Sequence, residues 1–370
     1  MKKILICSHY FYPDLTPRAF RATSLADYFS ENGYEVDIMY GKEKKIFKNY
    51  NINFKQKNKV NNMLLMKEWN PGKVRKIISK IAVFTFGETE LIKKSNMSYF
   101  ESIGDINQYQ FILSIGQPFY THFFISKLIR KYNWKGVSIS DWGDPFYSNP
   151  GYSKMGIHLK ILQKNIMSIF DYVSIPIEAA IPYYSEFVTK ERLKVIPQGF
   201  DLKVKEIECV DLVMYEEVPT FIYAGAFYEE IRNPENILKF LKSLDQPFKF
   251  IIFTDKSDFL YKKVVEPFVS EMNGKIIVYD KISREKLIGY MKKSDFLLNI
   301  ENKGDIQQPS KLIDFGISQK PILSIKPDDK EGLMKIKQFL NGNYEDSEII
   351  DIQKYDIEIV ANEFLKLFEK

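Results

Sequence analysis

The chain has 370 residues, of which 45% are hydrophobic and 27% charged, a composition that excludes intrinsic disorder and fibrous proteins. Because a single hydrophobic core rarely organises so many residues, the length favours two domains of roughly 150 to 200 residues each. The two cysteines, Cys7 and Cys209, lie far apart without a CxxC pair, which argues against a disulfide framework or a zinc cluster and favours a reducing compartment.

The net charge of +5 comes largely from one basic segment. Residues 41–95 contain 14 Lys or Arg and four acidic residues, a net charge of +10, so the rest of the chain is slightly acidic. Residues 73–84 mix apolar and basic side chains, a pattern typical of an interfacial element on anionic lipid. A helix packed on its domain with a solvated lysine face is the alternative. No apolar run reaches the roughly 18 residues of a spanning helix, and the N-terminal run is too short for a signal peptide.

The first forty residues predict a strand, a helix and a second strand. An apolar run at 3–8 is followed by residues 18–41, in which a helix and then a second strand are legible. Thr16 can serve as the N-cap of this helix, Pro17 as its first residue and Gly33 as its end. Such a βαβ unit belongs to a parallel sheet.

The same alternation continues along the chain. Further short apolar runs lie at 110–115, 136–140, 171–177 and 193–199, with a helix expected from His122 to Lys131. Residues 200–217 have mixed charges and no helical face, and from residue 218 the alternation of strands and helices starts again.

We therefore predict an α/β protein of two facing Rossmann-like domains with a cleft between them. The expected parts are an N-terminal domain at 1–200, a linker at 201–217, a second domain at 218–350 and a C-terminal helical segment at 351–370 that can pack back toward the first domain.

Ligands of open parallel sheets bind beyond the carboxyl ends of the strands, so residues just after strands are the candidate site residues. In the loop within 223–238, Gly225 follows a strand and Arg232 precedes a helix that Asn233 and Pro234 can start. A cation and open backbone N–H groups can converge there on a diphosphate. The alternative is a capped surface helix with a solvated arginine.

A second loop lies within residues 304–323. Pro309 and Ser310 can begin a helix, and Lys311 then stands beside its open N–H groups, a suitable place for phosphate oxygens. Asp314 follows one turn later on the same helix face, where its carboxylate can accept hydrogen bonds from a ribose diol. An ordinary Lys and Asp pair on a helix surface is the alternative.

A third loop, SDWGDPF at 140–146, places Asp141 and Asp144 after a strand, where a carboxylate pair can do acid, base or electrostatic work; turn formation is the alternative. His122 lies at the same predicted sheet edge, and a capping or core role is equally compatible with its position. The three histidines are scattered and no Asp-X-Asp triplet occurs, so no metal site is expected.

Taken in order, these segments resemble the retaining glycosyltransferases of family 4, which have the GT-B fold. The resemblance spans nearly the whole chain and rests on YFYPDLTPRAFRATSLADYFSENGYEVDI, SDWGDPF, VIPQGFD, YAGAFYEEIRNPENIL, ISREKLIGYMKKSDFLLNI and QPSKLIDFGISQKPIL. Each segment is weak evidence alone, and the order and spacing make the combination specific.

The resemblance implies a site in which each domain has its own role. The residues implied in catalysis are Asp144, Arg232 and Lys311. The residues implied in donor binding are Gly225, Arg232, Lys281, Ile282, Asp305, Gln307, Pro309, Ser310, Lys311 and Asp314, with Asp314 at the ribose and the turn at Lys281 and Ile282 at the base. The residues implied in acceptor binding are Tyr10, Pro17, Arg18, His122 and Asp141.

The chain departs from the family pattern at two places. The first acid of the paired-acid motif is replaced by Ile306, between Asp305 and Gln307, which leaves the donor sugar open. The N-terminal loop lacks the Gly-Gly pair of the family, and Arg18 or Arg21 is the candidate replacement.

The expected activity is transfer of a sugar, with retention, from a UDP- or GDP-linked donor to a glycan or lipid-linked glycan in capsule, lipopolysaccharide or exopolysaccharide synthesis. The donor is a substrate, and neither a cofactor nor a metal is expected. The basic segment implies a cytoplasmic protein bound peripherally to the anionic inner face of the plasma membrane. The alternatives are a catalytically silent nucleotide- or glycan-binding protein on the same fold and a sugar-nucleotide epimerase. Nucleic-acid binding is disfavoured because no recognition motif accompanies the basic residues.

Overall fold

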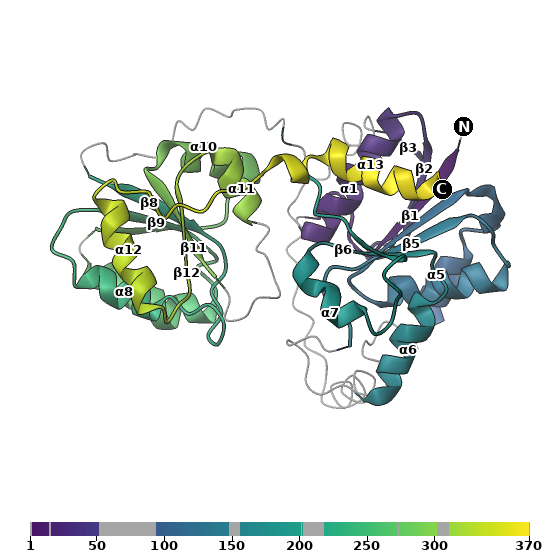
Figure 1. Cartoon of the computed structure of the whole chain (residues 1–370), viewed down its shortest axis with the longest axis horizontal. Coiled ribbons are helices and arrows are strands. Elements are labelled where there is room, and N and C mark those ends of the chain that lie inside the picture. The colour runs from purple at the N-terminus through teal and green to yellow at the C-terminus, as the bar shows by residue number, and fades with distance from the viewer. Residues whose placement is uncertain are drawn as a thin grey trace. The chain divides into compact units, whose positions relative to one another are not determined.

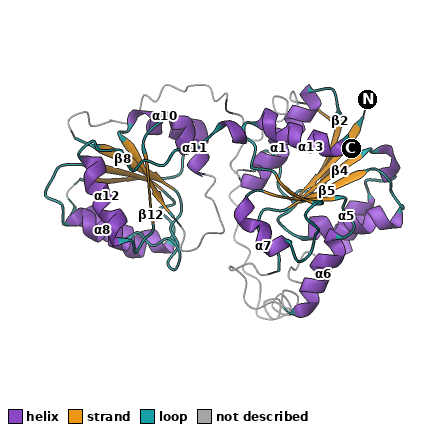
Figure 2. Cartoon of the chain, in the orientation of Figure 1, coloured by secondary structure: helices purple, strands orange, loops and turns teal. Residues whose placement is uncertain are grey.

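The computed structural model describes residues 2–14, 16–51, 94–147, 156–200, 202, 218–272, 274–301 and 311–369. The chain forms two compact units, Met1–Asp201 with Lys354–Lys370, and Leu202–Gln353 (Figure 1). In each unit a sheet of mainly parallel strands is flanked by helices (Figure 2). The two α/β units predicted from the sequence are therefore confirmed.

The sheet of unit 1 has seven strands in the order β3-β2-β1-β4-β5-β6-β7. Their bounds are β1 (Lys3–Ser8), β2 (Glu35–Tyr40), β3 (Lys45–Tyr50), β4 (Phe111–Ile115), β5 (Val137–Asp141), β6 (Tyr172–Ile175) and β7 (Leu193–Val195). All neighbours pair in parallel except β3, which runs antiparallel to β2 at the edge. The strand order reverses between β1 and β4, which makes the carboxyl ends of these two strands the topological switch point.

The helices of unit 1 cover both faces of this sheet. They are α1 (Pro17–Glu31), α4 (Lys94–Glu101), α5 (Tyr120–Lys131), α6 (Ile157–Met167), α7 (Ile181–Tyr184) and α13 (Ile357–Phe368), with short turns η2 (Ile106–Gln108), η3 (Glu178–Ala180) and η5 (Gln353–Tyr355). The start of α1 is as predicted: the Thr16 hydroxyl accepts a hydrogen bond from the Ala19 N–H at 3.2 Å, and Pro17 is the first helical residue. Beyond the helix, Gly33 adopts a φ of +84°.

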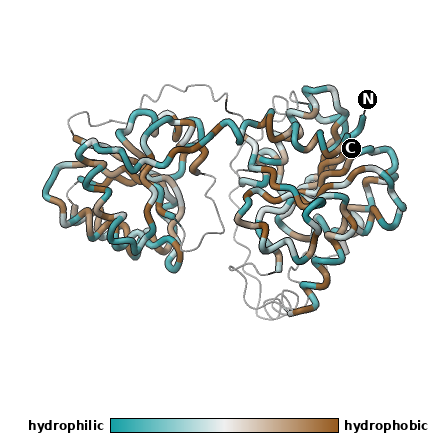
Figure 3. The backbone as a smooth tube through the Cα atoms, viewed as in Figure 1, coloured by the Kyte–Doolittle hydropathy of each residue, from teal (hydrophilic) through white to brown (hydrophobic). Residues whose placement is uncertain are grey.

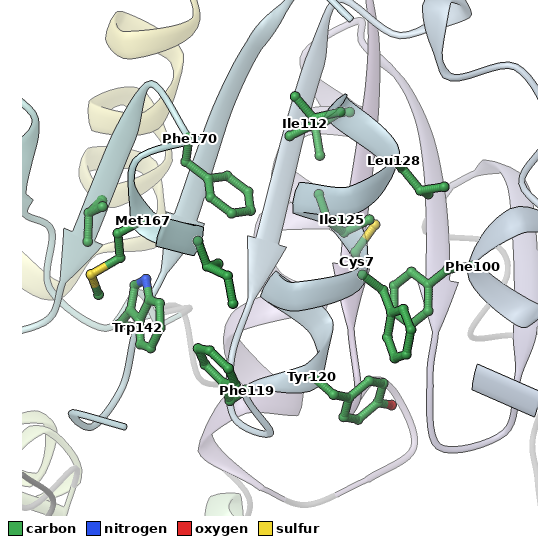
Figure 4. Close-up of a cluster of buried hydrophobic side chains, with 14 of the residues drawn as sticks. Cys7, Phe100, Ile112, Phe119, Tyr120, Ile125, Leu128, Trp142, Met167 and Phe170 are labelled. Atoms are coloured by element: carbon green, nitrogen blue, oxygen red, sulfur yellow. The ribbon is translucent and has the colours of Figure 1, made fainter. Parts of the chain in front are cut away.

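One layer of the unit 1 core packs α5 and its neighbouring helices against the sheet (Figure 4). Cys7 and Ile112 of the sheet and Ile125 and Leu128 of α5 are almost fully buried there. The continuous apolar runs that predicted these strands are explained by a sheet that is covered on both faces.

The opposite layer contains α13, which belongs to the end of the chain. Val360, Phe364 and Phe368 of α13 lie in the same buried cluster as residues of α1, β1 and β4. The Phe200 N–H donates to the Tyr355 carbonyl at 2.8 Å, and the Ile357 N–H donates to the Phe200 carbonyl at 2.9 Å. The end of the chain is thereby part of unit 1.

The sequence pattern does not predict strand β3, because its lysines stand out only as part of the basic segment. Asp37, fully buried on β2, accepts hydrogen bonds from the Asn49 N–H at 2.8 Å and the Tyr109 hydroxyl at 2.6 Å, and Lys48 Nζ lies 3.1 Å away. A buried carboxylate needs such partners, and here they fix the edge strand. The expected interfacial element at 73–84 lies outside the described residues.

Unit 2 has a five-stranded parallel sheet in the order β10-β9-β8-β11-β12. Its strands are β8 (Thr220–Ala224), β9 (Lys249–Phe253), β10 (Ile276–Tyr279), β11 (Phe296–Ile300) and β12 (Ile322–Ile325). Its helices are α8 (Glu235–Lys242), η4 (Tyr261–Val265), α9 (Glu266–Glu271), α10 (Arg284–Lys293), α11 (Lys311–Ser318) and α12 (Lys330–Leu340). The switch point of this sheet lies between β8 and β11.

The strands of both units run through apolar interiors, as the hydropathy colouring shows (Figure 3). In unit 2 the ring of Phe221 stacks on Phe250 at 4.4 Å and on Phe296 at 4.7 Å across three adjacent strands. Among the described residues, no helix has the length and apolar character needed to cross a membrane. The predicted linker residues 201 and 203–217 are not among the described residues.

Candidate functional site

The loop after β8 brings Gly225 and Arg232 to the carboxyl edge of the sheet of unit 2. Gly225 has a φ of +148°, which L side chains rarely adopt, and its N–H donates to the Phe253 carbonyl at 2.8 Å. The chain then folds into a short hairpin in which Tyr228 and Arg232 exchange backbone hydrogen bonds of 2.9 and 3.2 Å. This local structure fixes the backbone of Arg232 next to the carboxyl ends of the strands.

The Arg232 side chain is only 7% exposed, so it is not the solvated surface arginine of the alternative interpretation. Its guanidinium lies 5.9 Å from the centre of the Tyr228 ring, and its Nε has no hydrogen-bond partner within the described part of the chain. Burial raises the pKa of Tyr223 to about 12, and the nearby Arg232 opposes that shift. A buried cation with an unsatisfied N–H group is costly unless an acceptor such as an anion satisfies it.

Helix α8 begins close to the predicted residue. The Asn233 side-chain oxygen accepts a hydrogen bond from the Glu235 N–H at 3.0 Å, as a capping residue does. Pro234 occupies the N-cap and Glu235 is the first helical residue, one position later than expected. The open N–H groups of this helix follow Arg232 directly in the chain.

Helix α11 starts at Lys311 and follows β11, the strand next to β8, in the chain. Asp314 lies in its first turn, 18% exposed, and accepts a hydrogen bond from Arg284 Nε at 2.7 Å. The residues of this loop that lie outside the described residues are Asp305, Ile306, Gln307, Pro309 and Ser310, and the same holds for the Lys311 side chain.

The turn expected to receive the base follows β10. Lys281 is exposed and pairs with Asp255 at 3.1 Å, while Ile282 packs on the apolar cluster between the sheet and α10. Their backbone therefore lies at the same carboxyl edge of the sheet as Gly225 and the start of α11.

In unit 1, Asp141 is not available to an acceptor, because its carboxylate is fully buried and bonded within the core. Arg21 Nε and Nη2 donate to its two oxygens at 2.6 and 2.7 Å, and the Ser174 hydroxyl donates at 2.7 Å. Arg21 also donates to the carbonyl of Pro197 at 2.5 Å, so this ion pair joins α1, β5, β6 and the segment after β7. The position of Asp141 after an apolar run gave no sign of these partners.

Arg18 and Asp144 lie nearer the surface of the same edge. Arg18 Nη1 is 3.3 Å from Asp141, and its guanidinium lies against Gly143, where a side chain would collide with it. Asp144 is half-buried and acts electrostatically on Arg18 and on the hydroxyl of Tyr184. The structure thus brings Arg18 and Asp144 together.

Two further candidate acceptor residues lie near Arg18 in the sequence. Tyr10 is half-buried after β1, and Pro17 is exposed at the start of α1.

His122, on α5, is fully buried and faces a small cavity. Its Nδ1 shares a 2.8 Å hydrogen bond with the Ser114 hydroxyl, while Nε2 has no partner within the described part of the chain. A Cβ atom added to Gly116 would lie only 2.5 Å from Nε2 of His122, so only glycine fits at position 116. Burial is the main cause that lowers the pKa of His122 to about 3, so the imidazole is neutral near pH 7.

The cavity beside His122 is lined by Gly116, Trp142 and Asp144 among others and offers about 10 Å³, the room of one water molecule or hydroxyl oxygen. The Trp142 ring lies 4.4 Å from the His122 ring and 6.0 Å from the ring of Tyr184, whose buried hydroxyl has no described partner. Tyr184 and Arg284 were missed from the sequence because each lies in an ordinary helical pattern. Among the described residues, no group of three His, Cys, Asp or Glu side chains could hold a metal ion.

The chain matches no protein-family model, and no curated protein matches it. Solved structures do match it along its full length. HepE of Anabaena, in complex with UDP and glucose, is 10% identical with a TM-score of 0.61, and each chain is covered completely. Sucrose-phosphate synthase of Thermosynechococcus elongatus is 13% identical with a TM-score of 0.66, covering 100% of this chain and 98% of that one.

The lipopolysaccharide outer core galactosyltransferase WaaB, in its apo form, is 12% identical with a TM-score of 0.59, covering 100% of this chain and 99% of that one. At these identities the likeness concerns the fold. The two α/β units, with a seven-stranded and a five-stranded sheet, match these structures over their full length and give the chain the GT-B fold.

Proposed function

We propose that the chain is a glycosyltransferase that uses a UDP- or GDP-linked sugar and transfers the sugar with retention. The observation that carries this proposal is the buried guanidinium of Arg232 at the carboxyl edge of unit 2, whose Nε has no hydrogen-bond partner among the described residues. The complex of HepE with UDP and glucose, on the same fold, supports a nucleotide sugar as the ligand.

The donor site comprises the three loops at the carboxyl edge of unit 2. Arg232 and Lys311 neutralise the diphosphate, with help from the N-termini of α8 and α11. Asp314 accepts hydrogen bonds from the ribose, and the turn at Lys281 and Ile282 receives the base. The remaining donor contacts come from Gly225 and from the loop before α11, at Asp305, Gln307, Pro309 and Ser310.

The acceptor site comprises the carboxyl edge of unit 1, with residues 201–217 as the linker between the domains. Tyr10, Pro17 and Arg18 supply its outer contacts, and His122 offers a neutral imidazole to a hydroxyl group. Asp144 lies beside the cavity and is half-buried, so its carboxylate can act near the reacting sugar. Asp141 is left out of this set because it is bonded within the core.

The chemistry expected of these groups is a front-face substitution with an oxocarbenium-like transition state. The bond from the anomeric carbon to the diphosphate breaks as the acceptor hydroxyl approaches from the same face, and the proton of that hydroxyl passes to the leaving phosphate oxygen. Arg232 and Lys311 stabilise the negative charge that develops on the diphosphate, which is the largest single contribution such a site makes. No metal ion is needed in this scheme.

The acceptor is a glycan or a lipid-linked glycan of a capsule, lipopolysaccharide or exopolysaccharide. The basic segment at 41–95 supports peripheral binding at an anionic membrane on its cytoplasmic face. Sedimentation with anionic liposomes tests this, and equal sedimentation of a variant with the lysines at 55–59 and 73–80 neutralised contradicts it.

Ile306 in place of the first acid favours one competing function, a catalytically silent nucleotide- or glycan-binding protein. The two functions differ in turnover. A thermal-shift screen over sugar nucleotides identifies the donor, and release of the nucleoside diphosphate from that donor, with or without an acceptor, identifies an enzyme. Binding without any release supports the silent protein.

The phosphate assignment is tested with Arg232→Gln and Lys311→Gln. Each change removes charge-assisted hydrogen bonds, so calorimetric affinity for UDP or GDP should fall about 10- to 100-fold. Lys242→Gln is the control, since Lys242 belongs to an exposed pair with Glu271 elsewhere in unit 2. Unchanged affinity in both site variants contradicts the assignment.

A further inference from the structure

The ion pair between Arg284 and Asp314 lies at the ligand edge of unit 2. Both α10 and α11 follow strands of a parallel sheet, so both helices begin at its carboxyl edge. Arg284 is the first residue of α10, and Asp314 is in the first turn of α11. The two helices pack on one another, and the Arg284 Nε to Asp314 Oδ1 distance is 2.7 Å.

The pair is not accounted for by stability alone. An arginine at the first residue of a helix opposes the helix dipole, whereas a carboxylate in the first turn of α11 is favoured by it. The two side chains are 21% and 18% exposed, and at such partial burial the loss of hydration offsets much of the Coulomb attraction. A role in orienting the carboxylate explains the arginine better.

The contact also determines what Asp314 can offer a ligand. Burial raises the pKa of Asp314, and Arg284 opposes that shift, so the guanidinium favours the ionised, acceptor-only carboxylate. Arg284 Nε donates to Oδ1, and within the described part of the chain no side chain donates a hydrogen bond to Oδ2. A carboxylate held by one oxygen presents the other in a fixed direction, as a hydrogen-bond acceptor for a hydroxyl pair.

We infer that Arg284 is a positioning residue for the nucleotide donor: it orients Asp314 so that the site selects a ribose over a 2′-deoxyribose. This inference rests on the proposed function and adds to it the residue that orients the ribose-binding carboxylate. Arg284 acts through Asp314, and Asp314 makes the contact with the diol.

The experiment compares the affinities of the full chain for UDP, 2′-deoxy-UDP, GDP and 2′-deoxy-GDP. The wild-type chain should prefer the ribonucleotide of the accepted base by at least about tenfold, the value of a hydrogen bond to a charged group. In Arg284→Gln and in Asp314→Asn the preference should fall to within about twofold. The double variant should lose no more than either single variant, because both changes remove one interaction.

Arg284→Lys keeps the charge and loses the planar Nε–H donor, so it should show an intermediate preference and serve if the Gln variant does not fold. Lys335→Gln, which removes the same charge from a partly buried pair with Asp346, should keep the wild-type preference. Equal loss of affinity for both nucleotides, with the preference intact, overturns the inference and leaves the proposed function standing. Binding of none of the four nucleotides by the wild-type chain overturns both.

Discussion

At the scale of single residues, the carboxyl edge of the sheet of unit 1 depends on buried polar groups that are matched to one another. Asp141 is satisfied by Arg21 and Ser174, and the strong hydrogen bonds offset the cost of removing its charge from water. His122 is different, because its environment favours the neutral ring and leaves Nε2 at a small cavity. A neutral ring nitrogen there suits a hydroxyl group better than an anion.

The buried His122 predicts a pH dependence of stability. Its pKa is about 3 in the folded chain and is ordinarily 6.5, so the unfolded chain binds a proton that the folded chain does not. The stabilisation is fully present above pH 6.5 and is lost as the pH falls from there toward 3, with a slope of up to ~1.4 kcal/mol per pH unit.

His122→Gln removes this titrating group, so its unfolding free energy should fall less steeply between pH 6.5 and pH 4.5 than that of the wild-type chain. The unfolding free energy at each pH is measured by urea denaturation monitored through tryptophan fluorescence. All three tryptophans precede residue 201 and therefore report on unit 1. His158→Gln on the exposed start of α6 is the control and should follow the wild-type slope. Equal slopes in all three proteins would contradict the prediction.

At the scale of elements, α13 contributes to the same edge although it is the last helix of the chain. Phe364 is fully buried, and the Arg21 guanidinium lies 5.2 Å from the centre of its ring. Because Arg21 holds Asp141 and the carbonyls of the segment after β7, the helix covers the ion pair that fixes the end of β5.

Phe364→Ala should therefore lower the unfolding free energy of unit 1 by about 3 to 5 kcal/mol, the usual cost of removing a buried ring. Ile359→Ala on the same helix is the matched control: Ile359 is 47% exposed, so its loss should cost under about 1 kcal/mol. Chemical denaturation of both variants checks the difference. Similar values for the two would mean that α13 packs too loosely to support the edge.

At the scale of the whole molecule, the two units are expected to divide the work of the reaction. The buried Arg232 is in unit 2, and the cavity with His122 and Asp144 is in unit 1. Variants in the two units should therefore separate donor binding from transfer.

Asp144→Asn should reduce sugar transfer at least about tenfold, because a carboxylate near the reacting sugar acts mainly in the transition state. Affinity for the nucleoside diphosphate should stay within about twofold of the wild-type value, in contrast to Arg232→Gln. Steady-state transfer assays combined with calorimetry distinguish the two patterns. Full turnover in Asp144→Asn would contradict a role in the reaction and would mean that Asp144 only helps to form the turn.

The sequence predicted the local features well, because short-range patterns determine them. The Thr16 and Pro17 start of α1 and the strands β1, β2 and β8 follow from capping chemistry and apolar runs. The edge strand β3 was not predicted, since its lysines hide the alternation and its contacts to the buried Asp37 on β2 are not visible in the local sequence.

By itself, the sequence determined that the chain forms two parallel-sheet units and which loops follow their strands, because periodicity, caps and strand ends are local properties. The tertiary structure alone decided that Arg232 is buried, that Asp141 is bonded to Arg21 and that Arg284 holds Asp314. The two ion pairs join residues 120 and 30 positions apart along the chain, which only the packing of helices on the sheets brings together. Burial and long-range pairing therefore separate the candidate ligand-binding groups from those that hold the fold.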